Sequence, residues 1–198
     1  MRRVLILVCL TALAATPAVA AVAGNPADKL AKLPIDPYRY DYAKKCLKHP
    51  QKGTVALERW LGKNAGGVSW GTMRCEKWGK NSASLHAEGR AIDWHLDVHS
   101  ARDRAEAKRL INLFLARDKK GNNHALARRM GVQELIWNCK GWFSGDGGMR
   151  RYSACFDSKG RPRKIDDTTA HRNHIHIGVN WAGARMQTTF WRSSAARH

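Results

Sequence analysis

Apolar residues at helical spacing fall in three parts of the chain. Over residues 38–62 they predict a helix in two pieces, interrupted at 50–53 by a proline and a glycine and ending at the glycine of position 62. The strongest helical pattern begins at Ser100, with Asp103 placed for a capping box. The buried stripe of this helix is expected to be Leu110, Ile111, Phe114 and Leu115. A short helix is predicted over 125–130.

Short apolar runs predict four strands, over residues 68–74, 90–96, 132–137 and 175–181. Residues 141–170 are rich in Gly, Ser, Asp, Arg and Lys, which indicates a long loop or an irregular hairpin. A helical front part followed by strands with helices between them is typical of an α+β fold. We therefore expect a small, largely antiparallel sheet flanked by helices.

The first residues have the pattern of an export signal. A basic start, an apolar run over residues 4–15 and an Ala-Val-Ala end at 18–20 are typical of a secretory signal peptide. Thr16 and Pro17 interrupt the run before the about 20 apolar residues that a membrane span needs. The predicted organisation is a signal peptide over 1–20 (with Ala23 as the alternative cleavage site), an exposed lead-in over 21–37, one domain over 38–192 and a flexible tail over 193–198. Export implies an extracellular or periplasmic protein with no membrane span after signal removal.

Export also changes how the cysteines are interpreted. Cys9 leaves with the signal, and an even number of four remains, which favours disulfides in an oxidising compartment. Three pairings are possible. Cys46–Cys75 and Cys139–Cys155 are preferred, because each closes a loop within one neighbourhood of the chain. A four-cysteine zinc site is disfavoured, because no pair has C-x-x-C spacing.

The charge of the chain is strongly positive. Without Arg2 and Arg3 it keeps 33 basic and 16 acidic residues, spread along its whole length. A field of this sign concentrates anionic partners, such as cell-wall polymers, anionic lipids or nucleic acid. Composition does not rank these partners.

Two segments bring together side chains that can bind a metal. His174 and His176 lie two apart on a predicted strand and therefore share a face. In the other segment, Gly89 allows a sharp turn between His86 and the strand from which Asp93 projects. Three nitrogen or oxygen ligands with one open position are a common way to hold catalytic zinc. Taken singly, each segment also fits exposed histidines or a surface carboxylate.

The two segments together resemble the clan of D-alanyl-D-alanine metallopeptidases and lysostaphin-type endopeptidases, which has His-x6-Asp and a distant His-x-His. His86 to Asp93 matches the first spacing and His174 to His176 the second, and the resemblance covers about residues 68–181. Members cleave peptide bonds of bacterial peptidoglycan with one zinc ion. The resemblance implies His86, Asp93 and His176 as ligands of one Zn²⁺. It implies a non-ligand role for His174 in assisting the catalytic water or the transition state.

The resemblance further implies Arg74 as the group that holds a substrate carboxylate or the developing oxyanion. One departure concerns the Glu-x-x-His of the carboxypeptidase branch. Asn173 stands three residues before His176, and His171 three before His174, so that glutamate is missing. His174 is then expected to act as the general base, with His171 as the second choice, since a neutral imidazole accepts a proton near pH 7.

Together with the predicted export signal, the resemblance implies a monomeric, secreted zinc metallopeptidase of D,D-carboxypeptidase or endopeptidase type. Its expected partners are peptidoglycan peptides and anionic cell-wall polymers, with no nucleic acid. A zinc-stabilised wall-binding module without hydrolytic activity and a metal-dependent nuclease are the alternatives; the nuclease leaves His86 and Asp93 without a role. His95 is a possible substitute ligand because it shares a face with Asp93. Trp142 is expected at the substrate cleft.

Overall fold

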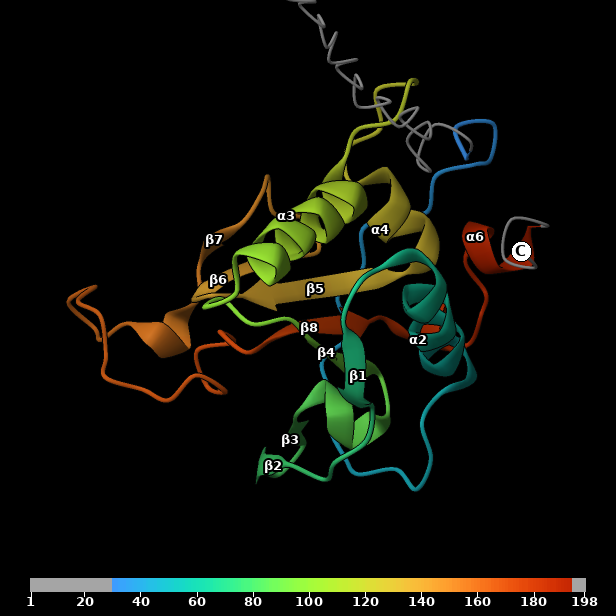
Figure 1. Ribbon diagram of the computed structural model, residues 1–198. Coiled ribbons are helices and arrows are strands. Elements are labelled where there is room, and N and C mark those ends of the chain that lie inside the picture. The colour runs from blue at the N-terminus through green and yellow to red at the C-terminus, as the bar shows by residue number, and fades with distance from the viewer. Residues whose placement is uncertain (1–29, 194–198) are drawn as a thin grey trace, which may run out of the picture.

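One six-stranded antiparallel sheet carries the structure, which is a computed structural model that describes residues 30–193 (Figure 1). The strand order is β1-β4-β8-β5-β6-β7. The strands are β1 (Val68–Gly71), β4 (Ala91–His95), β5 (Val132–Trp137), β6 (Lys140–Phe143), β7 (Arg150–Arg151) and β8 (His174–Val179). A separate two-stranded hairpin is formed by β2 (Lys77–Gly79) and β3 (Ser82–Ala83). The predicted α+β fold is confirmed, whereas the expected signal peptide lies outside the described residues.

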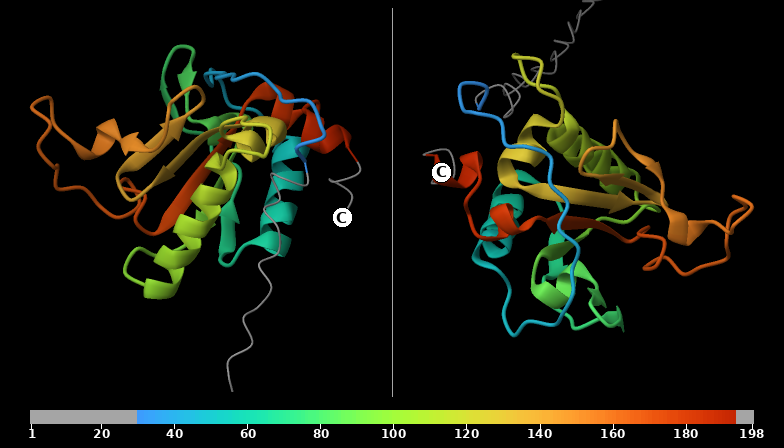
Figure 2. Two further views of the ribbon diagram at one scale, coloured as in Figure 1. Left: turned by 90° about the horizontal axis from the view of Figure 1, so that it is seen from above. Right: turned by 180° about the vertical axis from the view of Figure 1, so that it is seen from behind.

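The larger helices pack on one face of the sheet. They are α2 (Lys52–Asn64), α3 (Ala101–Leu115) and α4 (Ala125–Met130), and two short helices follow β8, α5 (Trp181–Ala184) and α6 (Thr189–Arg192). Figure 2 shows α2 and α3 on one side of the strands, with the amino-terminal segment and the β2–β3 hairpin on the other side. The sheet therefore has a helix-covered face and a second face partly covered by irregular chain.

Alternation along the strands explains this division. On β8, Ile175 and Ile177 are fully buried in the same core as Leu57, Leu110 and Phe114 of the helices. The residues that alternate with them, His174 and His176, point to the second face, because successive side chains of a strand alternate. Burying an Ile side chain contributes roughly 1.5–3 kcal/mol, so a register slip would be costly.

The helix predicted from Ser100 is confirmed as α3. The Ser100 hydroxyl accepts a hydrogen bond from the backbone nitrogen of Asp103 at 3.3 Å. The Asp103 carboxylate does not close a reciprocal box but accepts from the backbone nitrogen of Asp97 at 3.1 Å. The short helix over 125–130 is confirmed as α4.

The first helical piece predicted within 38–62 is wrong. Residues 34–51 form an extended segment, here called the strap. The helix covers only Lys52–Asn64, and it ends two residues after the expected stop at Gly62. The strap makes backbone hydrogen bonds to other parts of the chain that would be lost in a helix. The Asp41 backbone nitrogen donates to Gln133 Oε1 and that of Lys44 donates to Glu88 Oε1, each at 2.9 Å. Tertiary contacts therefore override the local helical pattern. The lead-in up to residue 37 is not wholly exposed either, since Leu30 is buried in the main core.

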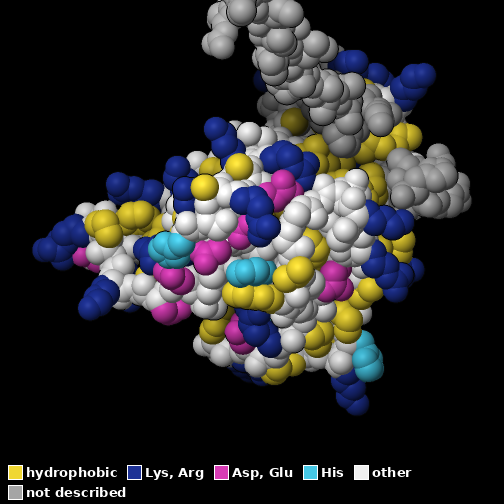
Figure 3. All heavy atoms as spheres, viewed as in Figure 1, with side chains coloured by type: hydrophobic (Ala, Val, Ile, Leu, Met, Phe, Trp, Pro, Cys, Tyr) yellow, Lys and Arg dark blue, Asp and Glu magenta, His cyan; other side chains and the backbone are white. Residues whose placement is uncertain are grey.

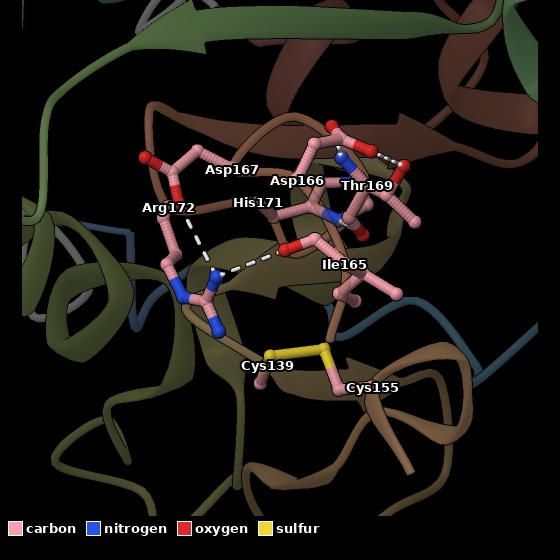
Figure 4. Close-up of a disulfide and its surroundings, with 8 residues drawn as sticks. All are labelled: Cys139, Cys155, Ile165, Asp166, Asp167, Thr169, His171 and Arg172. Atoms are coloured by element: carbon pink, nitrogen blue, oxygen red, sulfur yellow. Dashed lines mark hydrogen bonds and ion pairs between the residues drawn. A yellow bond between two sulfur atoms is a disulfide. The ribbon is translucent and has the colours of Figure 1, made fainter. Parts of the chain in front are cut away.

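Two disulfides hold the irregular parts. Cys46–Cys75 ties the strap to the segment after β1, and Cys139–Cys155 ties the β5–β6 turn to a 3-10 turn at Ser153–Cys155 (Figure 4). Both preferred pairings are confirmed. The region expected as a loop or irregular hairpin over 141–170 contains most of β6, then β7, the 3-10 turn and much irregular chain. Within residues 30–193, no helix is long and apolar enough to cross a membrane.

Candidate metal centre

His86, Asp93 and His176 meet on the second face of the sheet, at its centre. Asp93 on β4 lies directly opposite His176 on β8 in the antiparallel register. His86 belongs to a 3-10 turn, Leu85–Glu88, whose first backbone groups are capped by the Ser84 hydroxyl. Gly89 ends this turn at φ 64°, a conformation that glycine adopts without strain, and directs the chain into β4. Local turn chemistry thus places His86 over a strand pair that carries the other two groups.

One atom from each of these three side chains forms a small triangle. His86 Nε2 lies 3.0 Å from Asp93 Oδ1 and 3.1 Å from His176 Nδ1, and the last two atoms are 3.2 Å apart. Ligand atoms about 2.0 Å from a tetrahedral ion lie about 3.3 Å from one another. The triangle therefore has the size that one metal ion requires.

The opposite atom of each side chain is already engaged. His86 Nδ1 lies 3.3 Å from the Thr72 carbonyl oxygen, and His176 Nε2 lies 2.8 Å from Glu134 Oε1. Both partners can only accept when Glu134 is ionised, so these ring nitrogens carry the protons. When both rings are neutral, as metal binding requires, the nitrogens inside the triangle have lone pairs that face a carboxylate oxygen. A cation satisfies three converging acceptors, so the buried group could hold one metal ion.

The charges around the triangle favour a bound cation. Burial alone lowers the pKa of His176, but its hydrogen bonds to Asp93 and Glu134 outweigh burial and raise that pKa to about 9. For Asp93, burial raises the pKa, and hydrogen bonds to His176 and His86 outweigh it and hold the pKa well below the usual range. Two buried carboxylates thus attract positive charge to this position, either a proton or a metal ion.

His174 lies beside the triangle but outside it. Its Nδ1 is 2.8 Å from Asn173 Oδ1, and its Nε2 is 3.4 Å from Asp93 Oδ1. The Nε2 atom is buried and has no hydrogen-bond partner. Burial lowers the pKa of His174 to about 4. A neutral ring that donates from Nδ1 to Asn173 directs the lone pair of Nε2 into the site.

Arg74 and His171 also reach the site. Arg74 donates to Asp93 Oδ2 from Nη1 and to Glu76 Oε1 from Nε, the latter at 2.6 Å, and its side chain is 44% exposed. The ring centroid of His171 lies 4.8 Å from that of His174 and 5.8 Å from that of His176. Burial lowers the pKa of His171 to about 3. All the residues singled out in the two sequence segments are therefore gathered in one place, apart from His95.

His95 is not part of the triangle. Its Nδ1 atom lies 2.8 Å from the Asn173 carbonyl oxygen, and its ring stacks on Trp70 with centroids 4.3 Å apart. His95 lies opposite His174 across the two strands, two residues along β4 from Asp93. The idea that it replaces a ligand therefore finds no support in the geometry.

A cleft of about 400 Å³ opens next to His176. Besides Arg74 and His171, it is lined by five aromatic side chains, Tyr40, Tyr42, Trp78, Phe143 and Tyr152. Trp142 is not among them. It is fully buried in the core, and the expectation that it lies at the cleft is wrong. Trp78 of the β2–β3 hairpin, 73% exposed, is the tryptophan that lines the cleft.

The sequence prediction missed Glu134 and Tyr40. Glu134 is the one carboxylate within the apolar run that forms β5, and it is buried between His176 and the Tyr40 hydroxyl, which donates to Glu134 Oε2 at 2.5 Å. Gly178 on β8 makes room for it, since a Cβ there would lie 2.7 Å from Glu134 Cγ. A lone acidic residue inside a buried strand is the signal that could have indicated it.

The fold and the site together define an α+β domain with a buried His–Asp–His group on its sheet. The chain belongs to the family described as VldE, C-terminal domain, whose model matches residues 46–174, more than half of the 198 residues. The match includes His86, Asp93 and His174 and ends two residues before His176. No curated protein and no solved structure matches the chain. The resemblance to the peptidoglycan metallopeptidase clan stays a prediction.

Proposed function

We propose that the protein is a secreted zinc metallopeptidase that hydrolyses peptide bonds in bacterial peptidoglycan. The observation that carries the proposal is the buried triangle of acceptors, His86 Nε2, Asp93 Oδ1 and His176 Nδ1, with the unpartnered Nε2 of His174 beside it. Two imidazoles and one carboxylate are a donor set that suits zinc. Two disulfides agree with an oxidising compartment.

Each residue of the chain has a distinct task in this proposal. His86, Asp93 and His176 would hold zinc, which when bound polarises a carbonyl and acidifies water. His174 accepts the proton of the attacking water at Nε2 and passes it to the leaving amine. Asn173 holds the tautomer that this step requires, because its Oδ1 atom accepts from His174 Nδ1.

Arg74 has the position for charge stabilisation. It holds the outer oxygen of Asp93, and its partly exposed guanidinium lines the cleft. A cation at this point can offset a substrate carboxylate or a developing oxyanion. His171 lines the same cleft and is the second candidate for the proton transfer. Because the sequence lacks the Glu-x-x-His glutamate of the carboxypeptidase branch, the proposal assigns the proton transfer to these histidines.

The first test measures zinc stoichiometry. His86→Ala, Asp93→Ala and His176→Ala are each expected to lose the bound ion, whereas His99→Ala serves as a control because His99 is exposed and pairs with Asp167. Retention of about one zinc in all three site variants would refute the ligand assignment.

The second test measures hydrolysis. Purified protein is incubated with peptidoglycan and with DNA, each with and without a chelator. We expect new soluble amino groups from peptidoglycan, their loss on chelation and their return with added zinc. Wall binding without cleavage would replace the proposal with a zinc-stabilised module, and chelator-sensitive DNA cleavage would replace it with a nuclease. His174→Ala should keep its zinc and lose at least about 100-fold in rate.

A further inference from the structure

A strongly basic surface lies outside the metal centre. Residues 140–164 are here called the basic lobe. They contain β6 and β7, at one edge of the sheet, and the irregular chain after them, which projects from one end of the molecule (Figure 1). The lobe contains seven basic and two acidic residues, a net charge of +5. All seven basic residues are exposed. Dark blue side chains gather on this end of the molecule in Figure 3.

Acidic residues in and beside the lobe do not neutralise this charge. Asp166 and Asp167, which follow the lobe, are engaged by Thr169 and by Arg172 and His99. The two acidic residues of the lobe each pair with one arginine, Asp146 with Arg150 at 2.9 Å and Asp157 with Arg161 at 2.7 Å. Lys140, Lys159 and Lys164 make no ion pair with any described residue. Three exposed ammonium groups therefore remain available to an external anion.

The lobe is held in a fixed shape. The Cys139–Cys155 disulfide closes its base, and the Arg163 backbone nitrogen donates to the Cys155 carbonyl at 2.8 Å. The same disulfide lies against the segment that carries His171 (Figure 4), where the Cys139 backbone nitrogen donates to the Ala170 carbonyl at 2.9 Å. Fixed charges lose less conformational entropy on binding than charges on a free tail. A polymer on the lobe would lie next to the cleft, which Tyr152 and His171 line.

The aromatic rings of the lobe indicate which kind of polyanion fits. Sites for single-stranded nucleic acid interleave basic groups with free aromatic faces on which bases stack. Here the guanidinium of Arg151 lies over the Phe156 ring at 4.8 Å, and that of Arg150 lies over Phe143 at 5.9 Å. The Tyr152 ring meets His171 edge-on at 5.3 Å. The lobe thus presents positive charge, while its aromatic rings already contact arginine or histidine side chains and are not free to stack on bases.

We propose that the basic lobe is a binding site for a phosphate-bearing polymer without aromatic bases, such as a polyol-phosphate chain of a cell wall. The site is separate from the metal centre, and binding there does not require hydrolysis. Its role is to hold the protein on an anionic surface with the cleft facing that surface. Strong salt dependence follows, since each neutralised phosphate releases a counterion.

The test measures binding of fluorescently labelled poly(glycerol phosphate) to the mature chain by anisotropy at several salt concentrations. The variant Lys140→Ala, Lys159→Ala, Lys164→Ala removes three unpaired charges. Its matched control replaces three other exposed lysines without ion pairs, Lys48, Lys52 and Lys108, which lie outside the lobe. We expect the lobe variant to bind at least about tenfold more weakly at low salt and to flatten the salt slope by about two, with changes under about twofold in the control.

Equal losses in both variants would refute the lobe as a site and leave only the overall charge. Tighter binding of single-stranded DNA than of poly(glycerol phosphate) by the lobe would refute the choice of polymer. Inorganic polyphosphate, run in parallel, separates general phosphate binding from recognition of the polyol. Repeating the titrations in chelator keeps the result independent of the proposed peptidase, because the lobe should bind equally well without zinc.

Discussion

Replacing Glu134 by Gln tests whether the buried carboxylate sets the metal affinity. In the native protein Glu134 Oε1 accepts from His176 Nε2 at 2.8 Å, and Glu134 Oε2 accepts from the Tyr40 hydroxyl at 2.5 Å. Glutamine keeps the size of the side chain but removes the negative charge. It can still accept from His176, but its amide NH₂ cannot accept from Tyr40.

The expected effect is a loss of metal affinity with the fold retained. Partners of metal-binding histidines raise ligand basicity and fix the tautomer, and their removal costs 10–100-fold in affinity. This range corresponds to about 1.4–2.8 kcal/mol. The upper half of the range is expected for Glu134→Gln, because the carboxylate is buried and its charge is little screened.

The assay is competition for zinc with a chromophoric chelator at pH 7, with circular dichroism to verify folding. Glu76→Gln is the matched control, since Glu76 lines the same cleft and contacts Arg74 but no metal-binding ring. Tyr40→Phe removes only the outer hydrogen bond and should weaken zinc binding by less than Glu134→Gln. A folded Glu134→Gln protein whose zinc affinity stays within twofold of wild type would refute the reasoning.

Two further predictions concern stability. Gly178→Ala places a methyl group against Leu85 Cδ1 and Glu134 Cγ, so it should lower the unfolding free energy by about 1–3 kcal/mol and also weaken zinc binding. A variant as stable as wild type in urea would contradict this. Burial raises the pKa of Asp118, but hydrogen bonds from Asn122 and Arg129 outweigh burial and lower it to about 2. Because the folded pKa lies below the ordinary 3.8, the stabilisation of about 2 kcal/mol is complete above pH 3.8 and disappears as the pH falls through about 2. The urea midpoints of wild type and Asp118→Asn should therefore converge between pH 5 and pH 2, and a constant gap would show that this carboxylate is not the titrating group.

Some of this site could be predicted because strand periodicity is local. The two-residue spacing of His174 and His176 places both on one face whatever the partner strands are. His86 could not be placed in this way. It lies on a 3-10 turn, and only the resemblance to a spacing pattern connected it with Asp93. Periodicity thus indicates which face a side chain occupies but not what lies opposite it.

Glu134 shows why the rest escaped prediction. It reaches His176 because β5 pairs with β8, two strands that are separated in sequence by a hairpin and a long irregular segment. Strand order is a property of the whole sheet, and the local run that contains Glu134 is apolar apart from Gln133 and Glu134. The sequence of that run predicts a buried strand correctly and says nothing about its neighbours.

The strap reaches the metal centre through Tyr40. Its helical pattern gave the wrong local structure, yet its extended course is what delivers Tyr40 to Glu134 and fixes Asp41 against the sheet, where the Asp41 carbonyl accepts from the buried Arg90 at 2.8 Å. The Cys46–Cys75 bond secures the end of the strap on the same side as the metal centre. The two hydrogen bonds from Tyr40 to Glu134 and from His176 to Glu134 therefore couple the position of the strap to the orientation of the proposed ligand His176. Metal binding and strap packing should stabilise each other, because each fixes an end of the same hydrogen-bonded series.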